Sequence, residues 1–361
     1  MPDLPDTSPV PADDRHSGGA LPLYRVYDTA LLDLDGVVYA GPRAIDHAVE
    51  VLAEARAEGM RLAYVTNNAS RTPTTVAHHL TELGVPAEPS DVITSAQAAA
   101  RVVADRVPAG SPVLVIGGAG LVEALTERGL KPVRSLDDGP LAVAQGYDPT
   151  VGWTQLAEAS YAVAQGLPWV ASNTDLTIPT ARGTAPGNGT LVAAVRTATG
   201  VEPVVAGKPL PPMHRETVIR TGAKRPLVIG DRLDTDIEGA FNGGVDSLLV
   251  FTGVTAPQDL PSAPPQYRPT YLAADLRGLL RVQPELVAAA DGSFGCGGWT
   301  ASVLDGEVVL SESHGEDPYD GLRALCAAVW AAADASAATS AGAAGAAETA
   351  DWQKAFTVLG L

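Results

Sequence analysis

Cysteine, lysine and long hydrophobic runs are all scarce in this sequence of 361 residues. The two cysteines, Cys296 and Cys326, are too few for a disulfide framework and argue against a cysteine zinc site. No apolar stretch approaches the roughly 20 residues that a membrane-spanning helix needs. Residues 1–20 are rich in aspartate and proline, so we expect a solvated tail and no signal peptide there.

Positive charge is scarce as well. The sequence holds 24 lysines and arginines against 42 aspartates and glutamates, which gives a net charge of −18. Such a field repels the phosphates of nucleic acids and anionic membranes, so we expect neither as a partner. Apolar residues make up 46% of the chain, which predicts a globular, cytoplasmic protein with a substantial core.

Short apolar runs alternate with helical patterns through most of the sequence. Runs typical of strands covered on both faces occupy residues 29–33, 61–65, 91–94, 113–116, 141–144, 226–230 and 247–251. Helical spacing of apolar residues occurs at 44–58, 121–129 and 154–165, and Pro73 opens a further helix that Gly84 ends. This alternation predicts parallel sheets with covering helices.

The pattern changes after about residue 282. Residues 299–304 and 307–310 flank Asp305-Gly306, which predicts a β-hairpin with a tight turn. An Ala-rich helix is expected over 320–334, followed by a linker over 335–349 of small residues. We expect the last residues, from 351 onward, to form a short helix or strand.

Three of the apolar runs lead directly into polar residues, namely Asp33, Thr66 and Asp231. In open α/β sheets ligands bind at the carboxyl ends of the strands. The sequence therefore predicts one site assembled from three distant segments.

Asp33 and Asp35 give the strongest local signal. Residues two apart on an extended chain point the same way, so the two carboxylates lie side by side. At about 4 Å they repel by roughly 4 kcal/mol at an effective dielectric constant of 20, which a divalent cation with oxygen ligands would offset. A strand that simply ends in an Asp-Gly turn is the alternative.

Acidic residues cluster again at Asp231, Asp234 and Asp236. The spacing does not match an EF-hand, so the cluster is either part of a metal site or the start of a helix capped by Asp234 or Thr235. Lys208, one of four lysines, follows an apolar run and could neutralise a phosphate, or it is an ordinary surface lysine.

Together these segments resemble the four motifs of the haloacid dehalogenase (HAD) superfamily. Within it, the span 27–260 is similar to the subfamily of p-nitrophenyl-phosphatase, sugar-phosphatase and phosphoglycolate-phosphatase type enzymes. The resemblance rests on Leu32-Asp-Leu-Asp-Gly-Val-Val-Tyr-Ala-Gly41, Val65-Thr-Asn-Asn-Ala-Ser70, Pro186-Gly-Asn-Gly-Thr190, Gly207-Lys-Pro209 and Gly230-Asp-Arg-Leu-Asp-Thr-Asp236.

The resemblance implies a role for each motif residue. Asp33 would be the nucleophile and Asp35 the general acid and base. Mg²⁺ would bind Asp33, the main-chain carbonyl of Asp35, and Asp231, with Asp236 holding ligands or waters in place. Lys208 would balance charge between Asp33 and the phosphate.

The phosphoryl group itself would be bound by Thr66, Asn67 and Asn68, together with backbone amides near Gly36. From the residues alone, the hydroxyl and amide groups of 66–70 suit hydrogen bonds to phosphate oxygens, and an ordinary turn rich in Asn and Ser is the alternative.

The resemblance also implies the domain organisation. It predicts an α/β fold with an HAD-like, doubly wound parallel core formed by 23–94 and 201–282. Composition predicts the disordered tail before it, at 1–22. An α/β cap would be inserted at 95–200, and 283–361 would form a small α+β domain. We expect Asn173 and Asp175 of the cap to face the site, unless they belong to a polar surface loop. Members of the subfamily often dimerise through the cap, so the resemblance allows a homodimer formed in this way.

The C-terminal segment resembles the acetyltransferase-like (GNAT-like) tail of actinobacterial glycerol 3-phosphate phosphatases. The function implied is hydrolysis of a small phosphomonoester, foremost glycerol 3-phosphate, through an aspartyl-phosphate. Phosphoglycolate, a sugar phosphate, pyridoxal phosphate or a nucleotide are alternative substrates. A bifunctional protein with acetyltransferase activity is a further alternative, but the acyl-CoA loop is absent, so we expect the tail to be catalytically inert.

Overall fold

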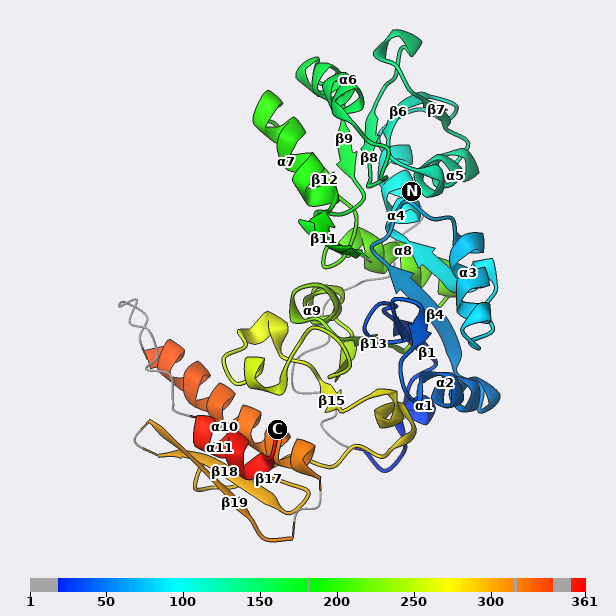
Figure 1. Ribbon diagram of the computed structural model, residues 1–361. Helices are drawn as coiled ribbons and strands as arrows, with labels where there is room; N and C mark the ends of the chain where they lie inside the picture. Colours follow the sequence, from blue (N-terminus) through cyan, green and yellow to red (C-terminus); the bar gives the residue numbers. More distant parts are fainter. Residues whose placement is uncertain (1–18, 181, 305, 315–316, 340–351) are drawn as a thin grey trace. The chain divides into compact units, whose positions relative to one another are not determined.

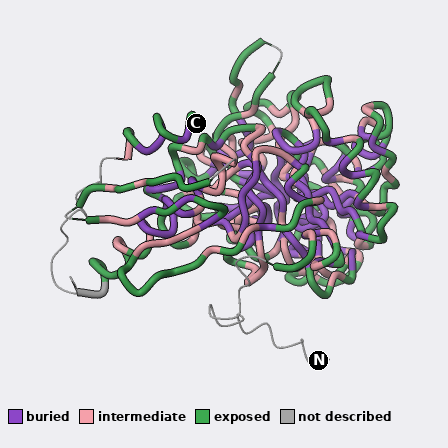
Figure 2. The backbone as a smooth tube through the Cα atoms, turned by 90° about the horizontal axis from the view of Figure 1, so that it is seen from below, coloured by how far each residue is buried: buried purple, intermediate pink, exposed green. Residues whose placement is uncertain are grey.

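The computed structural model describes residues 19–180, 182–304, 306–314, 317–339 and 352–361. Their contacts divide into two compact units. One unit comprises the described residues up to Ala30 together with Asp35–Arg61 and Arg225–Leu361, and the other comprises Leu31–Leu34 and Leu62–Lys224. Figure 2 shows buried and exposed stretches along the backbone, with exposed residues in strands such as β19 (Glu307–Glu312) as well as in turns. Most of the expected tail, residues 1–18, falls outside the described residues.

A six-stranded sheet carries the expected strand ends. Its strand order is β15-β14-β13-β1-β4-β5, and the pairs β13–β14, β14–β15 and β4–β5 are parallel. The strands are β1 (Thr29–Leu32), β4 (Arg61–Thr66), β5 (Val92–Thr94), β13 (Pro226–Gly230), β14 (Asp246–Val250) and β15 (Tyr271–Ala273). The order places β1 between β13 and β4, so the three strands that end in polar residues are neighbours, as the sequence predicts.

The helices that alternate with these strands follow the expected pattern. They are α2 (Ala48–Ala57), α3 (Pro73–Glu82), α8 (Pro211–Thr221) and α9 (Glu238–Gly243). Thr72 caps α3 by accepting a hydrogen bond from the Thr75 amide, with proline at the first helical position. Short elements complete this part: α1 (Leu23–Val26), β2 (Tyr39–Ala40), β3 (Arg43–Ala44), η2 (Pro89–Asp91), η4 (Leu233–Ile237), η5 (Pro257–Asp259), η6 (Pro265–Tyr267) and η7 (Leu276–Leu280).

A second parallel sheet lies in the segment where the cap is expected, except for its edge strand β12 (Val204–Val205), which belongs to the segment expected to be core. Its order is β12-β9-β8-β6-β7, formed by β6 (Pro112–Ile116), β7 (Lys131–Val133), β8 (Val143–Gln145), β9 (Trp169–Ala171) and β12. The accompanying elements are α4 (Ser95–Ala104), α5 (Ala119–Glu127), η3 (Leu136–Asp138), α6 (Trp153–Ala164), α7 (Asn188–Thr199) and the hairpin β10 (Thr177–Thr180) with β11 (Gly183–Pro186). Residues of β6, β8, β9, α6 and α7 share one apolar core.

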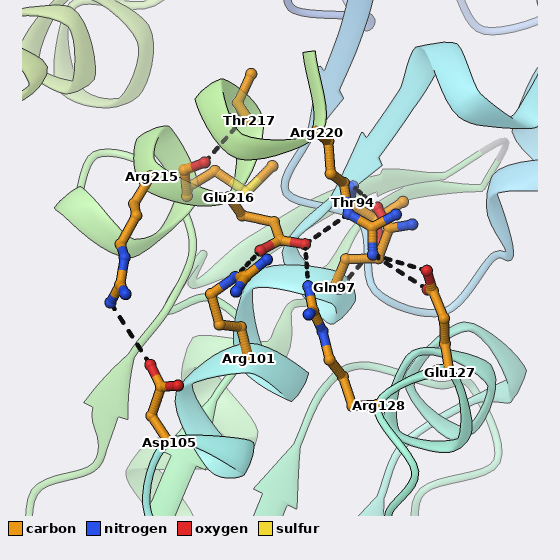
Figure 3. Close-up of polar contacts among 11 residues, drawn as sticks. Thr94, Gln97, Arg101, Asp105, Glu127, Arg128, Arg215, Glu216, Thr217 and Arg220 are labelled. Atoms are coloured by element: carbon orange, nitrogen blue, oxygen red, sulfur yellow. Dashed lines mark hydrogen bonds and ion pairs between the residues drawn. The ribbon is translucent and has the colours of Figure 1, made fainter. Parts of the chain in front are cut away.

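A buried ion-pair network joins α4, α5 and α8 (Figure 3). The Glu216 side chain is fully buried and binds three guanidinium groups: Arg101, Arg128 at 2.7 Å and Arg220 at 2.5 Å. Burial by itself raises the pKa of Glu216, but the guanidinium groups outweigh it and lower the pKa below its usual value. The carboxylate therefore stays ionised in the folded protein.

Glu216→Gln is expected to lower the free energy of unfolding by about 3 kcal/mol, because it leaves three partly buried guanidinium groups without their counter-charge. Glu127→Gln is the matched control, since Glu127 is half exposed and its pair with Arg220 contributes about 1 kcal/mol or less. Because the folded pKa is lowered, the contribution of Glu216 is present above its ordinary pKa of about 4.3 and fades as the pH falls. Urea unfolding of both variants measures this; equal losses would contradict it.

The C-terminal residues form a four-stranded antiparallel sheet with two helices. The sheet contains β16 (Val287–Ala288), β17 (Phe294–Cys296), β18 (Trp299–Leu304) and β19 (Glu307–Glu312), and α10 (Pro318–Thr339) and α11 (Gln353–Leu359) lie on one of its faces (Figure 1). The predicted hairpin is confirmed, although Asp305 in its turn falls outside the described residues. The final segment is a helix.

The expected linker at 335–349 is wrong for its first five residues. The helix α10 continues to Thr339, because alanine has the highest helix propensity and three of these five residues are alanine. The remainder, 340–349, lies outside the described residues. No helix in the described part of the chain is long and apolar enough to cross a membrane.

Candidate active site

Asp33 lies directly after β1, where it is paired with Lys208. The Lys208 ammonium donates to Asp33 Oδ1 at 2.6 Å and to the carbonyl of Val65 at 3.3 Å. Both charged side chains are largely buried, with 14% of Asp33 and 11% of Lys208 exposed. The lysine is therefore not an ordinary surface residue: it sits at the carboxyl ends of β1 and β4, as the sequence predicts.

Asp35 keeps an exposed surface, yet its pKa is raised because partial burial of the carboxyl disfavours the charged form. This is the direction that a general acid requires, since a proton must be held near neutral pH before it can be donated. Asp33 and Asp35 thus have different surroundings: the first carboxylate has a cation beside it, and the second has lost part of its hydration.

Asp231 follows β13 and is 1% exposed. Its Oδ2 accepts a hydrogen bond from the Val254 amide at 2.7 Å. A Cβ atom at Gly36 would lie 2.6 Å from that same oxygen, and one at Gly253 would lie 2.0 Å from it. Glycine at these two positions therefore lets the backbone approach the carboxylate, and Gly36 also has a positive φ of 89°.

The short π-helix η4 carries Asp236, which is 1% exposed and accepts from the Arg232 amide at 3.2 Å. The alternative of a helix capped by Asp234 or Thr235 is wrong. The residue before η4 is Arg232, no side chain caps the element, and Asp234 forms a surface ion pair with Arg232 at 2.8 Å. A Cβ atom at Gly230 would lie 2.1 Å from Asp236 Cβ, so glycine at the end of β13 leaves room for the Asp236 side chain.

Three carboxyl groups in the described part of the chain come together. Single oxygens of Asp33, Asp231 and Asp236 all lie within 4.8 Å of one another. Chain connectivity agrees with this, because Gly36, which packs on Asp231, is only three residues beyond Asp33. Carboxylates this close repel one another, and they are the hard oxygen donors that Mg²⁺ prefers. The donor set therefore fits a magnesium ion.

The turn after β4 organises the polar groups beside Lys208. Asn67 Oδ1 accepts from the Lys208 amide at 2.8 Å, and its Nδ2 donates to the Lys208 carbonyl at 3.2 Å. Thr66 Oγ1 accepts from the Asn68 amide at 3.1 Å, and Asn68 Oδ1 in turn accepts from the Ser70 amide at 2.9 Å. Asn68 thus closes the turn with its own side-chain oxygen.

The loop at 173–175 reaches this same turn. Asn173 Nδ2 donates to the Asn67 carbonyl at 2.7 Å, and Asn67 Nδ2 donates to both Asp175 oxygens at 3.3 Å. Asn188 fixes the loop by donating to the Asn173 carbonyl at 2.7 Å. The loop therefore contacts a motif residue and is not a detached polar loop.

Sequence reasoning missed the segment Phe251–Thr255, which follows β14. Its Thr252 hydroxyl donates to the Gly36 carbonyl at 2.5 Å, and the Thr255 amide donates to the Asp231 carbonyl at 3.1 Å. The same signal that marks the other strand ends was present, since an apolar strand leads there into Thr-Gly.

Comparison with known proteins agrees with this geometry. Residues 30–131 match the model of haloacid dehalogenase-like hydrolases, and residues 205–279 match a second HAD-hydrolase-like model. The chain is 46% identical over 313 residues to D-glycerol 3-phosphate phosphatase of Mycobacterium tuberculosis, covering 85% of this chain and 86% of the relative. The chain belongs to the haloacid dehalogenase-like hydrolases.

Other members of the family are similar over different lengths. An acid sugar phosphatase of Staphylococcus aureus is 38% identical and covers 69% of this chain and 95% of the relative. A crystal structure of a glycerol phosphate phosphatase from M. tuberculosis with magnesium has a TM-score of 0.81 at 44% identity, covering 86% and 92%. Residues 296–360 match a GNAT-like domain. The predicted family, fold class and GNAT-like tail of this HAD-like hydrolase are confirmed, as is its place among phosphatases.

Proposed function

We propose that this chain is a magnesium-dependent phosphatase that hydrolyses a small phosphomonoester, foremost glycerol 3-phosphate. The observation that carries the proposal is the ion pair of Lys208 with Asp33 beside the carboxyl groups of Asp231 and Asp236. Phosphoryl transfer needs mainly positioning and neutralisation of charge, and a chain of net charge −18 must concentrate positive charge locally.

The proposed reaction has two steps. An Asp33 oxygen attacks phosphorus, the bond from phosphorus to the leaving oxygen breaks, and Asp35 donates its proton to that oxygen. Asp35 then takes a proton from water, which attacks the aspartyl-phosphate and releases phosphate and the Asp33 carboxylate. Asp33, Asp231 and the main-chain carbonyl of Asp35 would hold Mg²⁺, with Asp236 behind them. The bound ion would neutralise charge on the phosphoryl oxygens.

The remaining chain residues would orient the phosphoryl group. Lys208 would face it between Asp33 and the Thr66–Asn68 turn, with the Thr66 hydroxyl donating to its oxygens. The Asn67 side-chain amide already donates to the Lys208 carbonyl and to Asp175, so Asn67 would contribute its backbone amide. The Gly36 amide already donates to the Tyr39 carbonyl at 2.8 Å, so the backbone contacts expected there would come from neighbouring amides.

Asp175 supports a substrate whose organic part carries hydroxyl groups. Its carboxylate lies beside Asn67 and accepts hydrogen bonds, which suits glycerol or a sugar. The carboxylate of phosphoglycolate would be repelled at the same place. The similarity to D-glycerol 3-phosphate phosphatase points the same way. Three further expectations belong to this proposal. Residues 95–200 would form the cap, the protein would be cytoplasmic, and a homodimer would form through the cap, as is common in the family.

A panel of phosphorylated metabolites, assayed for phosphate release with Mg²⁺ and with excess EDTA, tests the proposal. We expect glycerol 3-phosphate to have the highest kcat/KM and phosphoglycolate to be at least about tenfold poorer, a difference of about 1.4 kcal/mol. Sugar phosphates, pyridoxal phosphate and nucleotides complete the panel. The absence of any chelator-sensitive phosphate release would contradict the proposal.

A further inference from the structure

The C-terminal domain shares one apolar core with the strands and turns that carry Asp231 and Asp236. Buried residues of both parts form it: Ile237, Leu249, Leu260 and Leu272 on one side, and Trp299, Leu322, Leu325, Cys326, Val329, Ala355, Phe356 and Leu359 on the other. All these residues belong to the same compact unit. The domain therefore packs directly against the strands and turns that carry Asp231 and Asp236, and is not a separately tethered module.

An aromatic contact links this domain to the loop around Asp231. Tyr319, in the first turn of α10, stacks on Phe251 with ring centroids 5.4 Å apart and an interplanar angle of 24°. Phe251 begins the segment whose Val254 amide donates to Asp231 Oδ2 and whose Thr252 hydroxyl donates to the Gly36 carbonyl. The position of that segment therefore determines where the Val254 amide meets the Asp231 carboxylate, and it also holds Gly36, which lies close to that carboxylate.

The turn that carries Asp236 packs against the same apolar core. Ile237, the next residue, is 1% exposed within the shared cluster, and Leu233 at the start of η4 packs against it. Arg323, one turn beyond Tyr319, donates to the Leu272 carbonyl and is paired with Asp320. The start of α10 is thus anchored to β15, and Tyr319 contacts Phe251 directly after the neighbouring strand β14.

We propose that Tyr319 is a positioning residue for the metal site: its ring holds Phe251, and through it the loop that orients Asp231. This inference rests on the proposed function and assigns to the C-terminal domain a role in magnesium affinity that does not require acetyl transfer. Groups that orient metal ligands from outside typically alter metal affinity by 10- to 100-fold when they are removed.

Three variants of the full chain test the proposal. Tyr319→Ala removes the ring, and Tyr319→Phe keeps the stack while removing only the hydroxyl. Trp330→Ala is the matched control, because Trp330 also joins α10 to the core, through a 3.0 Å hydrogen bond to the Leu260 carbonyl and the Arg268 guanidinium over its ring. Trp330 lies outside the loop at 251–255, so its loss should destabilise the domain without displacing Asp231.

Calorimetric titration with Mg²⁺ alone and the Mg²⁺-induced rise in melting temperature give readouts that do not depend on turnover. For Tyr319→Ala we expect about tenfold weaker Mg²⁺ binding and an equal increase in the Mg²⁺ concentration needed for half-maximal activity. KM for the phosphomonoester at saturating Mg²⁺ should stay unchanged, and Tyr319→Phe should behave as the parent.

Two results would overturn the inference. One is unchanged Mg²⁺ affinity in Tyr319→Ala, and the other is an equal loss of affinity in Trp330→Ala, which would show general destabilisation instead of positioning. A parent protein that binds Mg²⁺ but releases no phosphate would refute the proposed function alone. The Mg²⁺ affinities of the variants could still be measured and compared, so the inference about Tyr319 would still be tested.

Discussion

Replacing Asp33 by asparagine is expected to lower kcat by about 10⁴-fold or more while leaving the fold intact. The amide has nearly the same shape as the carboxylate, and its carbonyl oxygen still accepts the hydrogen bond that Lys208 makes to Asp33 at 2.6 Å. It lacks the negative oxygen that must attack phosphorus, so no covalent intermediate can form. Steady-state phosphate release by the purified variant measures the loss.

Asp28→Asn is the matched control for this prediction. Asp28 immediately precedes β1, at the opposite end of the strand, and is exposed. It accepts hydrogen bonds from Thr29 and from the Arg225 amide, so its replacement perturbs the strand without touching the carboxyl end. We expect near-parental kcat for Asp28→Asn. An Asp33→Asn variant that kept most of its activity would show that Asp33 is not the nucleophile.

Removing magnesium with excess EDTA is expected to lower activity by about 10³-fold or more, and adding MgCl₂ back should restore it. The physical reason is the crowding of negative charge. Oxygens of Asp33, Asp231 and Asp236 lie within 4.8 Å of one another, so a phosphate dianion would be repelled unless a dication is bound. Phosphate release during stepwise addition of Mg²⁺ to the chelated protein gives the measurement.

Two aspartates of the same segment separate a site effect from a general charge effect. Asp231→Asn should raise the Mg²⁺ requirement by tenfold or more, because it removes a buried carboxylate from the group. Asp234→Asn removes one charge nearby but only breaks an exposed pair with Arg232, so we expect little change. Full activity in EDTA, or equal effects of both variants, would contradict a magnesium site built on Asp231.

The sequence allowed the carboxyl-end site to be predicted because its signals are local. Apolar runs without alternation mark β1, β4 and β13, and the polar residue after each run lies at the edge where a parallel sheet binds ligands. The contact between Lys208 and Asp33 could be predicted only from the order of the motifs, because no local pattern indicates it. The resemblance to the HAD superfamily supplied that long-range information.

Other features had no local signal. The stack of Tyr319 on Phe251 joins residues 68 positions apart, and neither flanking sequence indicates it. The π-helix that carries Asp236 has no local sequence signal, so a capped helix start was an equally good interpretation of the sequence. The continuation of α10 to Thr339 could have been inferred, because alanine favours helix more strongly than it marks a linker.

The most direct test is to look for the phosphoryl group on Asp33. The protein is mixed with Mg²⁺ and an excess of glycerol 3-phosphate, quenched in acid within the first turnovers, digested and analysed by mass spectrometry. The account predicts one added phosphoryl group on the peptide that contains Asp33, removed by hydroxylamine and absent in Asp33→Asn. Active protein with no phosphorylated peptide, or with the group on another residue, would contradict it.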